Sequence, residues 1–105
     1  MKRTNEAELE AFQIPGEKGL AKAFDIVSGV PTMGVRIVEP ESNVPRTPHR
    51  HPERQVIYMI SGTATISNDV ETIDLIPGDF VLLESNEEHY VSTGKEEAKV
   101  FEVKY

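Results

Sequence analysis

The chain has 105 residues, which is enough for one domain with a modest hydrophobic core and too few for two. Its formal charge of −7 argues against a nucleic-acid partner, because a phosphate backbone would repel it. Cysteine is absent, so disulfides, thiolate metal sites and cysteine nucleophiles are excluded, and histidines, carboxylates and amides remain as candidate ligands.

The start of the chain gives no membrane signal. No apolar run approaches the roughly 20 residues that span a bilayer, and no apolar signal segment follows residues 1–6. We therefore expect a soluble, cytoplasmic protein without a membrane partner. Residues 1–18 are predicted to form an N-terminal arm with a short acidic helical turn capped by Asn5, which Pro15-Gly16 ends. Residues 19–105 are predicted to form a single domain.

The pattern after residue 19 predicts an all-β fold. Segments rich in Val, Ile, Thr, Phe and Tyr are separated by Gly, Pro, Asn and Asp about every ten residues, as in a β-sandwich or barrel. Turns are expected at Ser61-Gly62 and Pro77-Gly78-Asp79. Short strands must hide their edges, and a closed double-sheet jelly roll that dimerises edge to edge is one solution. The predicted strands span residues 20–28, 33–39, 47–51, 54–61, 63–68, 70–76, 79–84, 88–92 and 97–104.

Two of the three histidines, His49 and His51, lie two residues apart, and Gln55 follows four residues later. On an extended strand His49 and His51 project to the same face, where they can chelate one metal ion. The alternative is a solvated loop. His89 lies on a later strand, after the turn at Gly78, and can close the site from the opposite wall.

These spacings resemble the two sequence motifs of the cupin superfamily, G-x5-H-x-H-x3,4-E-x6-G and G-x5-P-x-G-x2-H-x3-N. The matching residues are His49, His51, Gly62, Gly78 and His89, and Gln55 occupies the position of the motif's glutamate. The departures at turn or wall positions are Asn43, Glu84, Asn86 and Thr93. The resemblance implies a cupin β-barrel, a jelly roll or double-stranded β-helix, that holds one divalent transition metal ion through His49, His51, His89 and Gln55.

Gln55 stands where the cupin motif has its glutamate ligand. A carboxamide oxygen can coordinate an ion but brings no charge, so affinity for hard Mn(II) should fall more than affinity for Fe, Co, Ni, Cu or Zn ions. The identity of the metal stays open among these six. In the alternative arrangement, Gln55 only hydrogen-bonds a water molecule on the ion.

Several further residues are candidates for the site wall. Arg36 lies in an apolar strand, where a guanidinium needs an anion or water, so it either anchors a substrate carboxylate or faces outward. Ile57 and Met59 share the face of Gln55, and with Phe80 they are expected to form an apolar wall. On the strand of Phe80, alternate residues are apolar on both faces, which indicates core packing or, alternatively, a second subunit.

The resemblance implies several possible activities, because cupins include dioxygenases, isomerases, decarboxylases and lyases. The leading hypothesis is a homodimeric, dioxygenase-like metal enzyme acting on a small organic acid or enol. One alternative is a non-catalytic module that binds a small ligand or metal. Another is an isomerase or lyase; in a metal-independent form, histidine would act as base, although three convergent imidazoles argue against that form.

Overall fold

The computed structural model describes residues 1–68 and 70–105, without the side chains of Pro48 and His49. In this described part the regular elements are a 3-10 turn, Glu6–Glu8, and ten strands. No helix in residues 1–68 and 70–105 has the length and apolar character needed to cross a membrane. The strands are β1 (Ala11–Pro15), β2 (Leu20–Val27), β3 (Thr32–Val38), β4 (Asn43–His49), β5 (Gln55–Ser61), β6 (Ala64–Ser67), β7 (Thr72–Leu75), β8 (Phe80–Leu83), β9 (His89–Ser92) and β10 (Ala98–Lys104).

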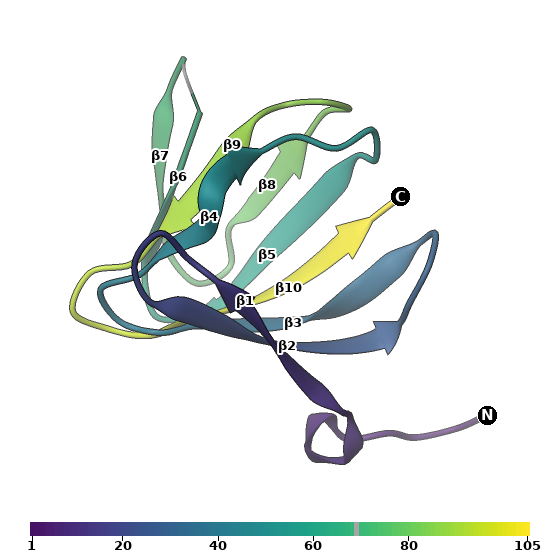
Figure 1. Cartoon of the computed structure of the whole chain (residues 1–105). Helices are drawn as coiled ribbons and strands as arrows, with labels where there is room; N and C mark the ends of the chain where they lie inside the picture. The colour runs from purple at the N-terminus through teal and green to yellow at the C-terminus, as the bar shows by residue number, and fades with distance from the viewer. Residues whose placement is uncertain (69) are drawn as a thin grey trace.

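The strands form two antiparallel sheets. The six-stranded sheet has the order β1-β2-β3-β10-β5-β8, and the four-stranded sheet has the order β4-β9-β6-β7. The two sheets face each other and curve around a common interior, so the molecule is an open-mouthed barrel (Figure 1). This architecture confirms the predicted all-β jelly roll.

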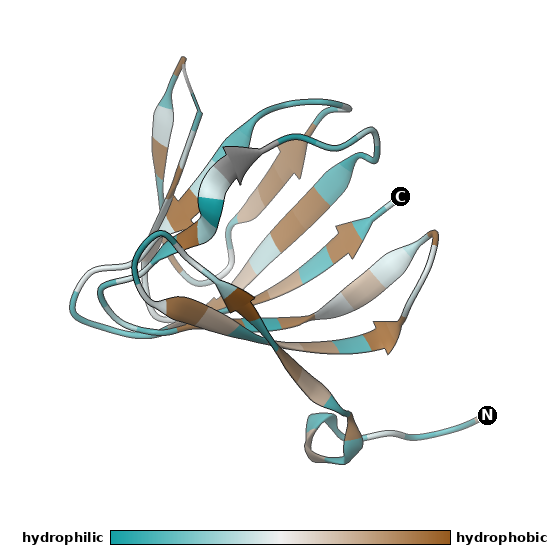
Figure 2. Ribbon diagram, in the orientation of Figure 1, coloured by the Kyte–Doolittle hydropathy of each residue, from teal (hydrophilic) through white to brown (hydrophobic). Residues whose placement is uncertain are grey.

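Period-two alternation places the core inside the barrel. On β5, Gln55, Ile57 and Met59 are buried, as the alternation predicts, while Tyr58 packs on the Phe80 ring outside. Burial of one such aliphatic or Met side chain stabilises a fold by about 1.5–3 kcal/mol. Apolar bands recur along the strands that line the interior (Figure 2). The buried cluster joins both sheets through Val38, Val44, Ile57, Met59, Ile66, Leu75, Leu83 and Val100.

Both predicted turns are present and depend on glycine. Gly62 and Gly78 have positive φ angles, 77° and 96°. Asp79 closes the second turn, because its carboxylate accepts the Ile76 amide proton at 2.9 Å. At Gly62 a side chain would also collide with the Glu97 carbonyl oxygen, so this position requires glycine on two grounds.

The N-terminal arm contains a 3-10 turn and a strand of the larger sheet. Asn5 caps the 3-10 turn, as predicted, by accepting the Ala7 amide proton at 2.9 Å. Strand β1 then pairs with β2 along its whole length and becomes an edge of the larger sheet. The domain boundary at residue 18 stays a prediction, although β1 belongs to the sheet of the barrel.

Strand β4 differs from its predicted range of 47–51. It begins at Asn43 and ends at His49, so His51 lies beyond the strand. The sequence obscures its start because β4 contains Pro45 and Pro48. Proline is tolerated here since β4 is an edge strand of its sheet, where a missing amide proton costs no ladder hydrogen bond.

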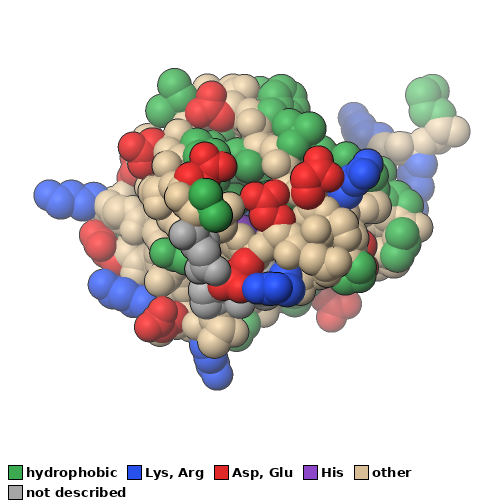
Figure 3. Space-filling model, turned by 90° about the horizontal axis from the view of Figure 1, so that it is seen from above, with side chains coloured by type: hydrophobic (Ala, Val, Ile, Leu, Met, Phe, Trp, Pro, Cys, Tyr) green, Lys and Arg blue, Asp and Glu red, His purple; other side chains and the backbone are tan. Residues whose placement is uncertain are grey.

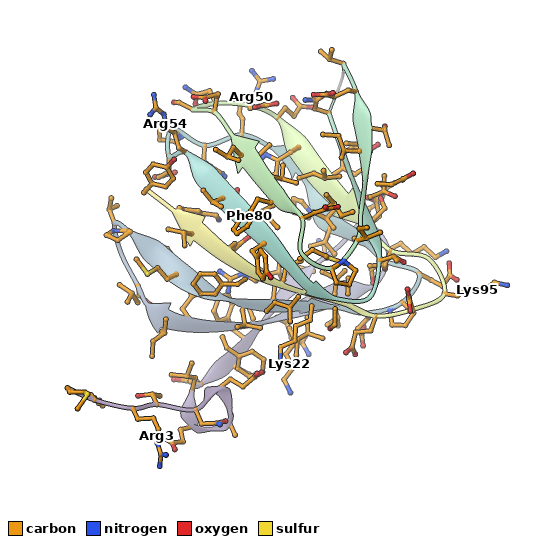
Figure 4. The ribbon with its side chains drawn as sticks, turned by 180° about the vertical axis from the view of Figure 1, so that it is seen from behind. Arg3, Lys22, Arg50, Arg54, Phe80 and Lys95 are labelled. Carbon is orange, nitrogen blue, oxygen red and sulfur yellow. The ribbon has the colours of Figure 1, made fainter. Side chains whose placement is uncertain are left out.

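The outward residues of β8 are not in the core. Phe80 and Leu82 are 65% and 68% exposed, whereas Val81 and Leu83 are buried. Figure 4 shows Phe80 on the outer face of the six-stranded sheet. Core packing of Phe80 and Leu82, and a place for Phe80 in the wall of the site, are therefore wrong. The apolar character of both strand faces misled the prediction, because one of them is an exposed sheet face.

Candidate metal centre

Two histidines meet inside the barrel. His51 lies in the loop between β4 and β5, His89 begins β9, and their ring centroids are 5.3 Å apart. His89 is only 4% exposed. The backbone of His49 pairs with that of His89 across β4 and β9, so the topology brings all three positions together. The side chain of His49 lies outside the described residues.

Backbone carbonyl groups fix the orientation of both described imidazoles. Nδ1 of His51 lies 2.9 Å from the Glu53 carbonyl oxygen, and Nδ1 of His89 lies 2.8 Å from that of Glu87. A carbonyl oxygen only accepts, so in each neutral ring Nδ1 carries the proton and Nε2 keeps its lone pair. This is the arrangement in which a histidine binds a metal through Nε2.

Gln55 completes the described donor set. Its Oε1 lies 3.0 Å from His51 Nε2, while its Nε2 donates to Glu102 Oε2 at 2.6 Å. With His51 neutral, Nε2 and Oε1 are both acceptors, so a positive charge, a proton or a metal ion, is needed between them. Two ligand atoms about 2.1 Å from one ion and at a right angle to each other lie about 3.0 Å apart. The pair therefore fits a shared divalent ion.

Arg36 lies inside the barrel and is 6% exposed, so the outward-facing alternative is wrong. Its guanidinium contacts two carboxylates, with NH1 2.7 Å from Asp25 Oδ1 and Nε 3.0 Å from Glu102 Oε1. These contacts meet the need of a buried cation for anions. The guanidinium was expected to bind a substrate carboxylate, but it already contacts these two protein carboxylates. Binding of a substrate by Arg36 therefore stays a prediction.

Two cavity residues, Glu102 and Lys104, escaped the sequence analysis. On β10, Val100, Glu102 and Lys104 line the cavity. Lys104 is aligned with Gln55 and Glu102 with Ile57 across β5, which places them on the inner face. The available signal was that Glu102 and Lys104 share the two-residue period of the buried Val100.

The cavity between the sheets has a volume of about 80 Å³. Most of its lining is aliphatic, and its polar groups gather around His89 and Gln55. Burial is the main cause that lowers the pKa of His89. The positive charge of Lys104, and that of His51 when it is protonated, act in the same direction, while the Glu87 carbonyl and the Glu102 charge oppose the shift. His89 is thereby held in the neutral form that a metal ligand requires.

The structure describes two of the three predicted histidine ligands, His51 and His89. Among the side chains that the structure describes, no three histidines or carboxylates gather at one point. His51, Gln55 and His89 come together, and the contribution of His49 stays a prediction.

Paired charges surround the mouth of the barrel. Arg50 contacts Glu88 at 2.6 Å and Arg54 contacts Glu84 at 3.4 Å. Both arginines lie at the same end of the molecule (Figure 4). Seen from above, acidic side chains are prominent on this end and the histidines are almost hidden (Figure 3). The arginines are thus rim charges, and each has a carboxylate partner.

Comparison with known proteins agrees with this architecture. The family model described as Cupin domain matches residues 34–104, which is more than half of the chain. No curated protein matches the sequence.

Solved structures share the fold at low sequence identity. The polyketide cyclase RemF from Streptomyces resistomycificus has 22% identity and a TM-score of 0.80, covering 99% of this chain and 78% of its own. A predicted oxalate decarboxylase from Thermotoga maritima has 16% identity and a TM-score of 0.85, covering 98% and 97%. An RmlC-like cupin from Shewanella frigidimarina has 15% identity and a TM-score of 0.81, covering 96% and 86%.

Proposed function

We propose, from the premise that the chain belongs to the cupin family, that it is a metal-dependent enzyme acting on a small organic acid or enol. The observation that carries the proposal is the pair of acceptor atoms, His51 Nε2 and Gln55 Oε1, 3.0 Å apart beside His89. The ion would be held by His49, His51, His89 and Gln55. It would supply Lewis acidity, and also electron transfer if it is redox-active.

Charge balance favours an anionic substrate. The two carboxylates of Asp25 and Glu102 are balanced by the two cations Arg36 and Lys104, and the proposed ligands are neutral. A divalent ion therefore gives a mainly aliphatic cavity an excess positive charge, which an anionic ligand relieves. Lys104 is better placed than Arg36 to meet that anion, because Arg36 already contacts two carboxylates.

The size of the cavity favours a small substrate. Its volume of about 80 Å³ is below the roughly 150 Å³ of an engineered cavity that binds benzene. The aliphatic wall, including Ile57 and Val100, would exclude water and strengthen the attraction between the substrate and the charged groups. One structural neighbour is named as a predicted decarboxylase of oxalate, a small dianion, which supports the same substrate class.

The reaction type depends on the native metal. A dioxygenase-like reaction is the leading case and requires a redox-active ion with O2 as co-substrate. The names of two neighbours, a polyketide cyclase and a predicted oxalate decarboxylase, favour a lyase or isomerase as the second case. Zinc or nickel would indicate that second class. In either case Lys104 would bind and orient the anion, and the burial that lowers the pKa of His89 would favour its neutral imidazole.

Elemental analysis of protein purified without added metal or chelator tests the proposal. We expect about one divalent ion per chain, lost in His51→Ala and in His89→Ala, because each change removes a neutral imidazole that would coordinate the ion. Glu10→Gln is the control, because Glu10 is exposed and precedes β1, outside the barrel interior. If wild-type protein binds no ion even after reconstitution, the metal-enzyme proposal is wrong. If it binds metal and small acids without product, the non-catalytic module is correct.

A further inference from the structure

We propose that Glu102 is a positioning residue for the metal site, which turns the oxygen of the Gln55 carboxamide toward the histidines and sets a negative charge behind it. The inference rests on the proposed metal site and assigns a role to a residue outside the ligand set. Gln55 and Glu102 would then divide between them the two tasks of a carboxylate ligand, a donor oxygen and a negative charge.

The first step is the orientation of the Gln55 amide. Gln55 is 3% exposed, and its two polar atoms face different partners, His51 on one side and Glu102 on the other. An ionised carboxylate only accepts hydrogen bonds, so the amide must present its NH2 group to Glu102. The 2.6 Å contact from Gln55 Nε2 to Glu102 Oε2 thus directs Oε1 toward His51 Nε2.

The second step is the competing orientation. Without metal, Nε2 of a neutral His51 is an acceptor, because Nδ1 is committed to the Glu53 carbonyl oxygen. A Gln55 amide turned by half a revolution would offer its NH2 group to that lone pair and form a good hydrogen bond. Such a bond would occupy the lone pair of His51 Nε2 and turn Gln55 Oε1 away from it, so neither atom could bind the metal ion. Glu102 disfavours this orientation, since its carboxylate would then face the amide oxygen.

The third step is the support of Glu102 itself. Its two oxygens have different partners: Oε2 receives the Gln55 amide and Oε1 lies 3.0 Å from Arg36 Nε. Arg36 is held in turn by Asp25 at 2.7 Å. Ion pairs are only weakly screened in a buried setting, so these contacts hold one oxygen of the Glu102 carboxylate toward Arg36 and the other toward Gln55.

The main test is the affinity of the whole chain for Zn(II) and Mn(II), measured by competition with a chromogenic chelator. We expect Glu102→Gln to weaken binding about 10- to 100-fold, the range found when an outer partner of a metal ligand is removed. Glu6→Gln is the matched control: it removes the same charge from an ion pair with Lys99 of the same strand, β10, but touches neither Gln55 nor the partners of Glu102. Its metal affinity should stay within a few-fold of wild type.

A double-mutant cycle separates positioning from a general charge effect. If Glu102 acts through Gln55, Glu102→Gln should have little further effect on metal affinity in a Gln55→Ala background. An equal loss in both backgrounds would overturn the positioning role. So would an unchanged affinity of Glu102→Gln while wild type binds metal. Absence of binding to wild type, by contrast, would remove the proposed metal site itself.

A transposed pair keeps the inference testable if Glu102→Gln does not fold. Gln55→Glu alone places two carboxylates at a contact that is now 2.6 Å, which is unfavourable. Gln55→Glu combined with Glu102→Gln restores one charge and one amide in exchanged positions. We expect this double variant to fold and to bind Mn(II) more tightly than Gln55→Glu. Equal affinities of these two variants would contradict the inference.

Discussion

Lys104 lines the cavity, and the described part of the chain shows no ion pair for its ammonium group. The proposed anionic substrate would supply the missing partner. Lys104→Met should therefore weaken the binding of oxalate, used as a small dianion probe, to metal-loaded protein about 10-fold or more, since a hydrogen bond to a charged group contributes about 1.5–3 kcal/mol. Isothermal titration calorimetry at equal metal content measures this change.

Lys99→Met is the control for this prediction. Lys99 lies on the same strand but pairs with Glu6 at 2.6 Å, away from the cavity lining. Lys99→Met removes the same charge from the molecule as Lys104→Met does, without changing the proposed site. Equal losses of oxalate affinity in both variants would show that net charge, and not Lys104, attracts the anion.

Residues of the site differ in how well the sequence predicts them. The positions of His51, Gln55 and His89 follow from motif spacing, and the structure brings their side chains together. Glu102 and Lys104 did not follow, because the inner set of β10 mixes them with the apolar Ala98 and Val100, while the other set contains the apolar Phe101 and Val103. The outer face of this sheet also carries apolar side chains: the ring centroids of Tyr58 and Phe80 lie 4.6 Å apart there. Alternation alone therefore does not decide which alternate residues of β10 face inward.

At the scale of elements, β8 is one of the two edge strands of the six-stranded sheet, opposite β1. Its sequence, Phe80–Leu83, contains neither charge nor proline, the devices that commonly protect an edge from pairing with another chain. Two copies related by a twofold axis can place this strand antiparallel to itself, and the uncharged face avoids repulsion between chains of net charge −7. The predicted homodimer stays a prediction, and we place its interface here.

Leu82→Lys tests this interface. A lysine in place of a side chain that is 68% exposed should leave the barrel folded but shift the protein toward monomer. Analytical ultracentrifugation over a range of concentrations measures the shift. Val30→Lys, in the β2–β3 connection, adds the same charge at an exposed apolar position away from β8 and should not change the association. A wild-type protein that remains monomeric at all concentrations would rule out the dimer.

At the scale of the whole molecule, turn spacing and period-two alternation predicted the barrel, and the structure confirms it. The sheet position of β1 was not predictable in the same way. Its five residues gain their strand conformation from a hairpin with β2, whose turn is closed by the Gly16 amide donating to the Gly19 carbonyl oxygen at 3.0 Å, and not from a strand pattern of their own. Similarly, the early start of β4 depends on its place at a sheet edge, which only the assembled fold provides.

The free energy of unfolding should depend on pH through His89. Its pKa is lowered in the folded protein, chiefly by burial. The unfolded chain therefore takes up the proton at higher pH than the folded chain does, and stability should fall as pH drops below about 6.5, the usual value for histidine. The loss should be complete below the lowered folded value. Urea unfolding in the presence of EDTA at several pH values measures this slope, and His89→Gln should reduce it.

The same series with saturating Zn(II) joins stability to the proposed site. An ion that binds only the folded chain adds stability at neutral pH, by an amount that grows with the ratio of free metal to Kd. Imidazoles must be neutral to coordinate, so this added stability should shrink on acidification, faster than the stability of the metal-free protein falls. His51→Ala should remove the added stability at every pH, because it deletes one of the two acceptors that lie 3.0 Å apart. Stabilisation by Zn(II) that persists unchanged at about pH 5, well below the usual histidine pKa, would mean that the ion is held by carboxylates elsewhere on this acidic chain, and not by the histidines in the barrel.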